Sequence, residues 1–376
     1  MIKDDFLSGI FYSVPNLRFP LYKNKWECKK IKDILKICHG KDYKHLESGK
    51  YPVLGTSGIF TYVNQYLCDW PCALIGRKGA SLDKPHYMNS PFWCVDTLYY
   101  SKPVKNNNPK WQYYFFQTIN WMKMNESSGI PSLRASTIEN IDVFVPSYQE
   151  QSNIVEFLDK IEQRIETQIK IISSIESQIK SINNHVAFDS ATNELSIGNL
   201  FDIKTNSKIL EKHDGKYCIV DMGTIDSNGN YITGKYTDDI TSILTKGTLV
   251  MPKDDIGGGK IICKTLYINE SNKYVLSDHV FALKLRNSKY NPLYFSSLIN
   301  SQYHNHNLKR LVTGSAQLGI NQENLNKYKL RFSDCLELQK KYSKLIQLIN
   351  EKLFIEKKLL YDLYNQKNYL MKNMFI

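Results

Sequence analysis

The chain has 376 residues, a formal net charge of +12 and 42% hydrophobic residues. At about 100–200 residues per domain, this length predicts two or three domains, each with enough apolar residues for a core of its own. Nineteen glycines and twelve prolines are too few for a collagen-like or disordered chain. The positive charge points to an acidic partner, and nucleic acid is the first candidate.

The cysteines and the apolar runs indicate a cytoplasmic protein with reduced thiols. None of the eight cysteines forms a Cys-x-x-Cys pair, and Cys68 and Cys72 lack a second pair at a zinc-finger spacing, so we interpret these two as buried free thiols. Residues Met1–Ser8 include two aspartates and no long apolar run, which argues against a signal peptide. No uninterrupted apolar run is long enough to predict a membrane span.

Short matches recur in the same order in the two halves of the chain. The pattern Ile31, Ile34 and Ile37 recurs as Ile197, Leu200 and Ile203, an offset of 166 residues, and Gly49-Lys50-Tyr51 recurs as Gly215-Lys216-Tyr217 at the same offset. Four later matches have offsets of 180 to 185: Asp96 with Asp278, Tyr114 with Tyr294, Gly129 with Gly314, and Leu133 with Leu318. Drifting offsets are what loop insertions in a duplicated domain produce.

Each half ends in a segment with the apolar spacing of a long helix. Ser147 and Glu150 form a predicted capping box at the start of the first helix, which we expect to run to about Val186, roughly 60 Å. Its heptad seam has one polar occupant, Gln168, and consists otherwise of Ile154, Leu158, Ile161, Ile165, Ile172, Ile175, Ile179 and Ile182. The seam of the second helix is interrupted by Glu356 and Lys367 and contains Ile346, Ile349, Leu353, Leu360, Leu363, Leu370 and Met374.

Two long amphipathic helices at equivalent places in a repeat favour pairing with each other. The alternative is that each helix packs only on its own domain, but each seam is longer than one small domain covers. An antiparallel coiled coil closes the chain most simply, with an approximate two-fold axis. The predicted domains are a globular domain 1–146, a spacer helix 147–188, a second globular domain 189–333 and a second spacer helix 334–376.

The globular halves are predicted to be mixed α/β. Short apolar runs bounded by Gly, Pro and Asp are typical of strands, and they occur at 72–76, 92–95, 247–251, 274–276 and 280–283. Residues 111–122 and 292–305 are predicted to be helices.

Several segments match the motifs of catalytic or nucleotide-binding sites only in part. Gly229–Tyr236 has phosphate-loop spacing but ends in Tyr236 where a magnesium-binding Ser or Thr belongs, and we interpret it as a turn between strands. The glycine-rich Asp255–Lys260 has no following helix, and we expect a tight turn that exposes Lys253 and Lys260. Asn291-Pro292 is interpreted as a helix start rather than a base-binding motif, and His304 and His306 would face different sides of a helix.

The basic charge belongs to the globular halves. The first spacer helix carries a net charge of −2 and the second +4, which leaves +10 for the two domains. Glycine-flanked basic loops suit contact with DNA, because Arg can bind guanine bidentately and Gln or Asn can pair with adenine. For any single lysine, a solvated surface is an equally valid interpretation. The candidate DNA-binding residues are Lys41, Lys44, Lys50, Arg77, Lys78, Lys84, Arg134, Lys253, Lys260, Lys309, Arg310, Thr313, Ser315 and Gln317.

Several segments together resemble the specificity subunit of bacterial type I restriction–modification systems. They are Leu17-Arg-Phe-Pro20 with Trp26, the Gly-Lys-Tyr-Pro-Val-Leu-Gly-Thr-Ser-Gly stretch at 49–58, Gly76-Arg-Lys-Gly79, Ser128–Leu133, Val145–Gln151 and Thr313–Leu318. The order of two globular domains alternating with two long helices adds to this resemblance. The second helix departs from the family pattern because it begins at Phe332-Ser-Asp-Cys-Leu instead of Pro-x-x-x-Glu-Gln.

The resemblance implies a non-catalytic DNA reader. Each globular half would be a target-recognition domain for one part of a split double-stranded DNA target, and the coiled coil would fix the gap between the parts. Two methyltransferase subunits would supply adenine-N6 methylation and bind S-adenosylmethionine, and restriction subunits, when present, would supply ATP- and magnesium-dependent cleavage. No cofactor or metal is expected in this chain itself.

Two other functions fit the sequence without the resemblance. One is a stand-alone adenine-N6 DNA methyltransferase with its own catalytic site, which would bind S-adenosylmethionine as an isolated chain. The other is a coiled-coil scaffold without affinity for DNA, which would show no steep salt-dependent DNA binding.

Overall fold

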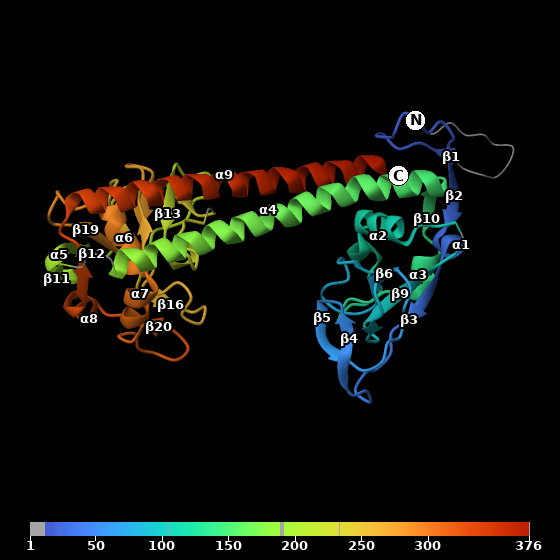
Figure 1. Cartoon of the computed structure of the whole chain (residues 1–376), viewed down its shortest axis with the longest axis horizontal. Coiled ribbons are helices and arrows are strands. Elements are labelled where there is room, and N and C mark those ends of the chain that lie inside the picture. Colours follow the sequence, from blue (N-terminus) through green and yellow to red (C-terminus); the bar gives the residue numbers. More distant parts are fainter. Residues whose placement is uncertain (1–11, 105, 189–191, 233, 376) are drawn as a thin grey trace. The chain divides into compact units, whose positions relative to one another are not determined.

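The computed structural model describes residues 12–104, 106–188, 192–232 and 234–375, so the expectation about Met1–Ser8 lies outside the described residues. Two compact units divide the chain, one comprising Met1–Gln168 and Leu359–Ile376 and the other Ile169–Lys358. Each unit therefore contains a globular domain and half of each long helix (Figure 1). The predicted domain ranges, which separate globular from helical parts, remain a prediction.

The first unit contains three small sheets and the helices that cover them (Figure 1). In spatial order, the sheets are β1-β2-β10 (Tyr12–Ser13, Trp26–Lys30, Asp142–Val145), β3-β9-β6-β7 (Leu35–His39, Leu98–Pro103, Cys72–Gly76, His86–Met88) and β5-β4-β8 (Gly58–Val63, Ser48–Gly55, Trp93–Cys94). The helices are α1 (Ile31–Ile34), α2 (Pro109–Thr118), the 3₁₀ helix η1 (Trp121–Met124), α3 (Ala135–Glu139), the beginning of α4 (Tyr148–Phe188) and the end of α9 (Leu336–Met374).

The second unit repeats this plan and adds one short sheet. Its sheets are β11-β21 (Asn193–Ser196, Lys329–Phe332), β12-β19-β15-β17 (Phe201–Lys204, Val280–Leu285, Leu249–Pro252, Leu266–Tyr267), β14-β13-β18 (Tyr236–Thr237, Tyr217–Val220, Tyr274–Leu276) and β16-β20 (Asp254–Asp255, Leu318–Gly319). Its helices are α5 (Ile197–Leu200), η2 (Met222–Thr224), α6 (Pro292–Asn300), α7 (Gln302–Lys309), α8 (Gln322–Lys327) and the beginning of α9 (Leu336–Met374).

Strand registers confirm the repeat and two of its predicted offsets. In the first half β4 pairs antiparallel with β5, the next strand along the chain, and parallel with β8. In the second half β13 pairs antiparallel with β14, again the next strand, and parallel with β18. Leu54 lies opposite Cys94 in the first half, and Val220 lies opposite Leu276 in the second. These pairs preserve the offset of 166 for the first block and the offset of 182 that matched Asp96 with Asp278.

Two other predicted offsets are wrong by a few residues. Asn108 and Asn291 both cap a helix that begins with proline, so the helices correspond at an offset of 183, and Tyr294 is the counterpart of Trp111 instead of Tyr114. Residues three apart lie on nearly the same face of a helix, which makes such a slip hard to see in a sequence. The second wrong offset concerns Leu133. Ser132 pairs with Lys78 in the first half, and Gly319 pairs with Asp254 in the second, so Ser132 corresponds to Gly319 at an offset of 187. At this offset the counterpart of Leu133 is Ile320 instead of Leu318.

The predicted helices 111–122 and 292–305 are each interrupted. The first ends at Thr118 and is followed by the 3₁₀ turn η1. The second is divided at Ser301, which is fully buried and whose hydroxyl accepts a hydrogen bond of 3.2 Å from the His304 backbone N–H. This side-chain cap starts α7 as a separate helix.

The long helices α4 and α9 run antiparallel. In the first unit Glu162 of α4 forms an ion pair of 2.6 Å with Lys367 of α9, and in the second unit Glu176 pairs with Lys357 at 2.9 Å. As the residue number rises along α4 from 162 to 176, the number of the paired lysine on α9 falls from 367 to 357, as an antiparallel pair requires. None of the helices in the described parts of the chain is long and apolar enough to cross a membrane.

The predicted seams supply part of the apolar core of the first unit. Ile154, Leu158, Ile161 and Ile165 are buried with Leu363 and Leu370 in the core that contains Trp26 and Trp111. The helices therefore pack both on a globular domain and on each other, so the two alternatives considered above are not exclusive. The polar seam residue Gln168 is also buried, with 5% of its surface exposed.

One buried glutamine attaches each long helix to its domain. Gln151 of α4 accepts a hydrogen bond of 2.7 Å from the Asn108 backbone N–H and donates one of 3.0 Å to the Pro146 carbonyl. Gln339 of α9 repeats the arrangement with the Asn291 N–H at 3.0 Å and the Ser333 carbonyl at 2.7 Å. We call Gln151 and Gln339 the clamp glutamines. The segment at the start of the second helix is Phe332-Ser-Asp-Cys-Leu instead of the family pattern, but Gln339 still makes both hydrogen bonds to the domain.

The predicted capping box at the start of α4 is only half present. The Ser147 hydroxyl accepts the Glu150 backbone N–H at 3.3 Å, as predicted. The Glu150 carboxylate does not return to Ser147. It instead accepts two hydrogen bonds, of 2.6 and 2.7 Å, from the guanidinium of Arg18, and both side chains are largely buried. A buried, bidentate ion pair is stronger than the local cap and ties the segment before the first domain to the helix.

Replacing Gln151 with Ala should lower the free energy of unfolding by about 2 kcal/mol, because the substitution leaves a buried N–H and a buried carbonyl without partners. Chemical denaturation of the full chain, followed by circular dichroism, measures this loss. Gln149→Ala, at an exposed position on the same helix, is the matched control and should change stability by less than about 0.5 kcal/mol. Equal losses in the two variants would contradict a clamping role for Gln151.

Candidate nucleic-acid interface

In the first unit a glycine-bounded loop follows the central strand β6. This loop, Gly76–Gly79, is held by backbone hydrogen bonds from Arg77 N–H to the Thr97 carbonyl at 2.8 Å and from Leu133 N–H to the Arg77 carbonyl at 2.9 Å. Gly79 donates to the Pro131 carbonyl at 2.9 Å and has a φ of +131°, which favours glycine. The loop is therefore anchored between two other segments of the domain.

Arg77 is oriented within this loop by two contacts. Its guanidinium donates a hydrogen bond of 3.0 Å to the Asp96 carbonyl and lies 6.0 Å from the centre of the Tyr99 ring. The side chain is half-buried, whereas Lys78 next to it is exposed. An arginine that is positioned in advance loses less conformational entropy when it binds a phosphate or a base.

The second unit builds an equivalent loop after its central strand β15. Ile320 N–H donates to the Lys253 carbonyl at 2.9 Å, as Leu133 donates to Arg77 in the first unit. Asp255, with 1% of its surface exposed, then accepts hydrogen bonds from the backbone N–H groups of Gly257, Ile261 and Ile262. Its carboxylate organises the glycine-rich turn that was predicted here, with Lys260 exposed and Lys253 half-buried.

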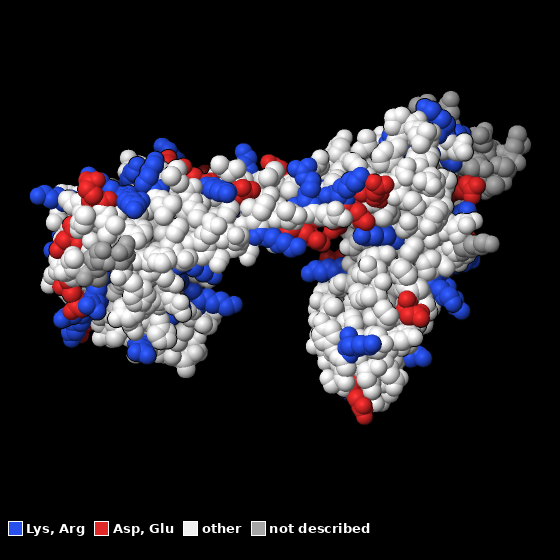
Figure 2. Space-filling view, in the orientation of Figure 1, with Lys and Arg blue, Asp and Glu red and all other residues white. Residues whose placement is uncertain are grey.

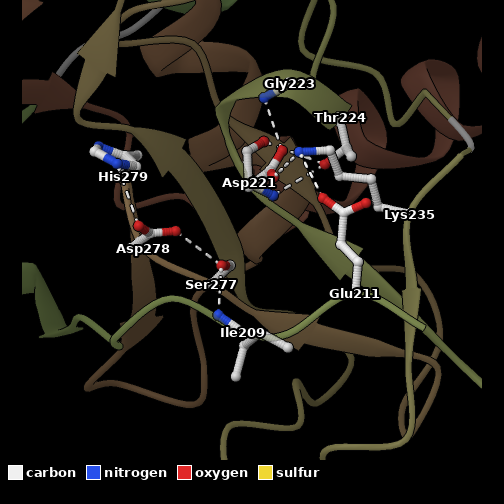
Figure 3. A network of polar contacts seen from close by, with 9 residues as sticks. All are labelled: Ile209, Glu211, Asp221, Gly223, Thr224, Lys235, Ser277, Asp278 and His279. Atoms are coloured by element: carbon white, nitrogen blue, oxygen red, sulfur yellow. Dashed lines mark hydrogen bonds and ion pairs between the residues drawn. The ribbon is translucent and has the colours of Figure 1, made fainter. Parts of the chain in front are cut away.

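A polar network borders the second loop (Figure 3). The ring of His279 contacts Asp254 at 2.7 Å through Nδ1 and Asp278 at 3.2 Å through Nε2, and Asp278 accepts a hydrogen bond of 2.9 Å from Ser277. Figure 3 shows Ser277 reaching Ile209, whose N–H donates to the Ser277 hydroxyl at 3.2 Å. The carboxylates of Asp254 and Asp278 and the imidazole of His279 therefore border this loop. The equivalent loop of the first unit carries Arg77 and Lys78 instead.

The same figure shows a second group of ion pairs around Lys235. The Lys235 ammonium lies 2.6 Å from the Asp221 carboxylate and 3.3 Å from Glu211, and Asp221 also accepts the Gly223 backbone N–H at 2.7 Å (Figure 3). The carboxylate neighbours raise the pKa of Lys235. This lysine is engaged within the domain, and we do not assign it to an interface.

A groove of about 1420 Å³ lies within the second unit, between its globular domain and the long helices. It is bordered by α4, α6, α7 and α9, and its floor includes Thr265 and Ser296. Six lysines and two glutamates, Glu176 and Glu351, line it; the lysines are Lys180, Lys246, Lys260, Lys264, Lys273 and Lys309. Only Lys260 and Lys309 belong to the residues that the sequence pointed to.

Comparison with known proteins identifies this pattern of two domains and two long helices. The family model described as "Type I restriction modification DNA specificity domain" matches residues 23–177 and again residues 191–363. The chain belongs to this family. Each half of the chain carries one match to this specificity domain.

Individual relatives agree with the family assignment. The chain is 28% identical over 116 residues to the type I restriction enzyme EcoprrI specificity subunit of Escherichia coli, an alignment that covers 31% of this chain and only 29% of that protein. The crystal structure of a type I restriction-modification S subunit from M. genitalium matches with a TM-score of 0.66 and 15% identity, over 97% of this chain and 99% of that one.

A second solved structure has the same fold. It comes from a study of complex assembly and conformational transition of the type I R-M system, and it matches with a TM-score of 0.53 and 9% identity, over 93% of this chain and 96% of that one. At these identities the two structural matches establish the fold of the specificity domains and long helices.

Several candidate residues of the first specificity domain gather at its loop. Arg134 directly follows Leu133, whose N–H is bonded to Arg77, so Arg134 lies beside Arg77 and Lys78 and forms an ion pair of 2.9 Å with Glu126. The Lys41 backbone is bonded to Cys94, close to the strand that leads to Asp96. The other candidates are exposed elsewhere on the domain, in the turn before β4, on β4 and in the turn before β7: Lys44, Lys50 and Lys84.

The candidates of the second specificity domain gather more closely. The Lys309 ammonium donates to the Gly259 carbonyl at 2.7 Å, which places it next to Lys260. Thr313 pairs with Gly319 through two backbone hydrogen bonds, so the exposed turn with Thr313, Ser315 and Gln317 lies against the strand that pairs with Asp254. Arg310 is exposed at the end of α7. Their contact with DNA remains a prediction.

The rejected motifs have structural roles. Asn291 caps α6 by accepting the Leu293 N–H at 3.0 Å, as predicted. His304 is buried against the Tyr328 hydroxyl at 2.9 Å, and burial lowers its pKa to about 4, whereas His306 is exposed. Asp226 closes the turn that leads into Gly229–Tyr236 by accepting the Asn230 N–H at 2.8 Å. Thr233 of that segment lies outside the described residues. Cys68 and Cys72 are both buried and free.

Replacing Arg77 with Ala should change recognition of one half of the target and leave the other unchanged, because Arg77 belongs to the first domain alone. The expected result is a relaxed base preference at one half-site and a loss of about 1–3 kcal/mol in binding. Competition binding with duplexes altered in either half-site measures both. Lys32→Ala, at an exposed lysine of α1, is the control. Unchanged affinity and preference would remove Arg77 from the interface.

Proposed function

We propose that this chain is the DNA-reading subunit of a type I restriction–modification complex and that its two specificity domains bind the two parts of a split target. The observation that carries the proposal is the repeated loop after β6 and β15, built from the same backbone bonds in each half. The side chains on this framework differ between the halves, as two readers of different sequences require. Phosphate contacts position such a domain, and base contacts give specificity.

The paired helices α4 and α9 act as the spacer between the readers. Two tethered readers gain effective concentration when the spacer matches the gap between their sites, so that weak half-sites combine into strong binding. Figure 2 shows basic and acidic side chains interspersed along these helices, which favours a structural role over a continuous DNA-binding track. The repeated, buried seam supports a rigid spacer.

The catalytic chemistry belongs to partner subunits in this proposal. Methyltransferase subunits bind S-adenosylmethionine and methylate adenine, and restriction subunits, where present, use ATP and magnesium. Within the second unit α9 exposes Leu345, Leu348 and Ile355 by 45, 50 and 63%. Their spacing of three and seven residues puts them on one face of the helix beside the seam, and we assign this face to a methyltransferase subunit.

Mapping N6-methyladenine in the source genome, with and without this gene, tests the proposed function. The expected result is the loss of one split methylation motif when the gene is deleted and its return when the gene is restored. Binding of S-adenosylmethionine to the isolated chain would favour the stand-alone methyltransferase instead. An unchanged methylation pattern would contradict the proposal if the methyltransferase subunits are expressed in both strains.

Inserting one heptad into each long helix should lengthen the gap between the half-sites. Seven helical residues add about 10.5 Å, which corresponds to about three base pairs at 3.4 Å each. The insertions belong after Gln168 in α4 and after Lys358 in α9, where each helix passes from one unit to the other. Sequencing of the methylated motif measures the gap, and an insertion in α4 alone is the control that breaks the pairing. A motif with the original gap would contradict the spacer role.

A further inference from the structure

The groove of the second unit differs in charge from the same region of the first unit. Eight and eleven residues after the clamp glutamine, α4 has Asp159 and Glu162, whereas α9 has Gln347 and Asn350 at the same positions. The corresponding carboxylates of the first unit are both used: Asp159 pairs with Lys110 at 2.7 Å, and Glu162 pairs with Lys367 at 2.6 Å. In the second unit two amides line the groove in their place.

Among the described residues Lys273 is the one groove lysine with an ion-pair partner, Glu270 at 2.8 Å, and three of the other five are neighbours. Lys180 is exposed on α4, Lys264 is half-buried and donates to the Asn300 carbonyl at 3.3 Å, and Lys309 donates to the Gly259 carbonyl at 2.7 Å. Neither glutamate of the groove forms an ion pair with these three lysines: Glu176 pairs with Lys357 at 2.9 Å, and Glu351 accepts a hydrogen bond of 2.8 Å from the Gln347 side chain. Lys309 and Lys180 lie close enough to Lys264 for their charges to act on it. Three neighbouring ammonium groups without ion-pair partners repel one another, and an anion bound between them would remove that cost.

We propose that this groove binds a phosphate of the DNA backbone through Lys180, Lys264 and Lys309. The inference rests on the proposed function, because it takes the DNA target as the source of the phosphate. It adds a contact that belongs to both α4 and the second domain. One bound phosphate would therefore fix the reading loop and the spacer helix to the same point of the duplex, and the loop would meet the bases in a defined register.

The electrostatics of Lys264 agree with an anion site. Desolvation, together with the charges of Lys309 and Lys180, lowers its pKa to about 8, and only the neighbouring Cys263 thiol acts in the other direction. The other charged groups that line the groove are Lys246, Lys260, Lys273, Glu176 and Glu351, and its tyrosines are Tyr231, Tyr267 and Tyr274. A phosphate beside Lys264 raises its pKa again, so binding takes up a proton at a pH of about 8 and above, where the free side chain has lost it.

Salt dependence of DNA binding tests the site. The full chain, assembled with its methyltransferase subunits, is titrated with a mixed-sequence duplex over a range of salt concentrations. Lys180→Met and Lys264→Met should each weaken binding by about fivefold for all sequences and reduce the slope of log K against log[salt] by about 0.9, because one phosphate contact is lost. Lys264→Arg should retain the slope, and Lys289→Met, at an exposed lysine outside the groove, is the control.

The pH dependence supplies a second measurement. The affinity of the wild-type complex should fall by up to about tenfold between pH 7 and pH 9, because free Lys264 loses its proton near pH 8 and must regain it on binding. Lys264→Arg stays protonated and should lack most of this decrease. An identical decrease in both proteins would overturn the involvement of Lys264.

The outcomes separate this inference from the proposed function. If the wild-type complex shows steep salt dependence and Lys180→Met and Lys264→Met show the same slope, the groove inference is wrong and the proposed function stands. If the wild-type complex shows no salt-dependent DNA binding, the proposed function itself fails. If Lys180→Met, on an exposed face of α4, reduces capture of the methyltransferase subunits without DNA, the groove binds an acidic protein surface and the phosphate assignment is wrong.

Discussion

Each specificity domain depends on one buried glutamine for its attachment to a long helix. Gln151 and Gln339 have no exposed surface, and each satisfies an N–H group at a helix start and a carbonyl at the end of the strand before the long helix. A buried side chain with both bonds made defines a single geometry, since any other orientation leaves polar groups unpaired. The loop that follows each central strand is therefore held at a defined place relative to its helix within the same unit.

The repeat, the two long helices and the short central strands could be predicted from the sequence because they depend on periodicity. Apolar residues at heptad spacing reveal the seam that buries Ile154 and Ile346, and Gly and Pro mark the ends of strands such as β6. The exact correspondence of Trp111 with Tyr294 could not be predicted, because a slip of three residues leaves the same face of a helix apolar. The break at Ser301 also escaped prediction, since it depends on one buried hydroxyl.

The candidate site was predictable only in part, for a different physical reason. Loops with Gly beside Arg or Lys stand out in the sequence, and the structure places Arg77 and Lys253 at equivalent positions of the repeat. Lys180 and Lys264 have no such signal, because their significance comes from the three-dimensional arrangement of the groove, whose two glutamates interact with Lys357 and Gln347 instead. In the first unit Asp159 and Glu162 pair with Lys110 and Lys367. The sequence reveals this contrast with Gln347 and Asn350 only once the clamp glutamines align the two helices.

The duplicated attachment has a consequence for how such genes can change. In both halves the clamp glutamine makes the same two backbone hydrogen bonds where the domain meets its long helix. A gene segment that encodes one domain could therefore be exchanged for another without new contacts at this junction. Under the proposed function, such an exchange would replace one reader, while the neighbouring domain keeps its own attachment. The clamp glutamines thus give both domains the same two hydrogen bonds as their junction with a long helix.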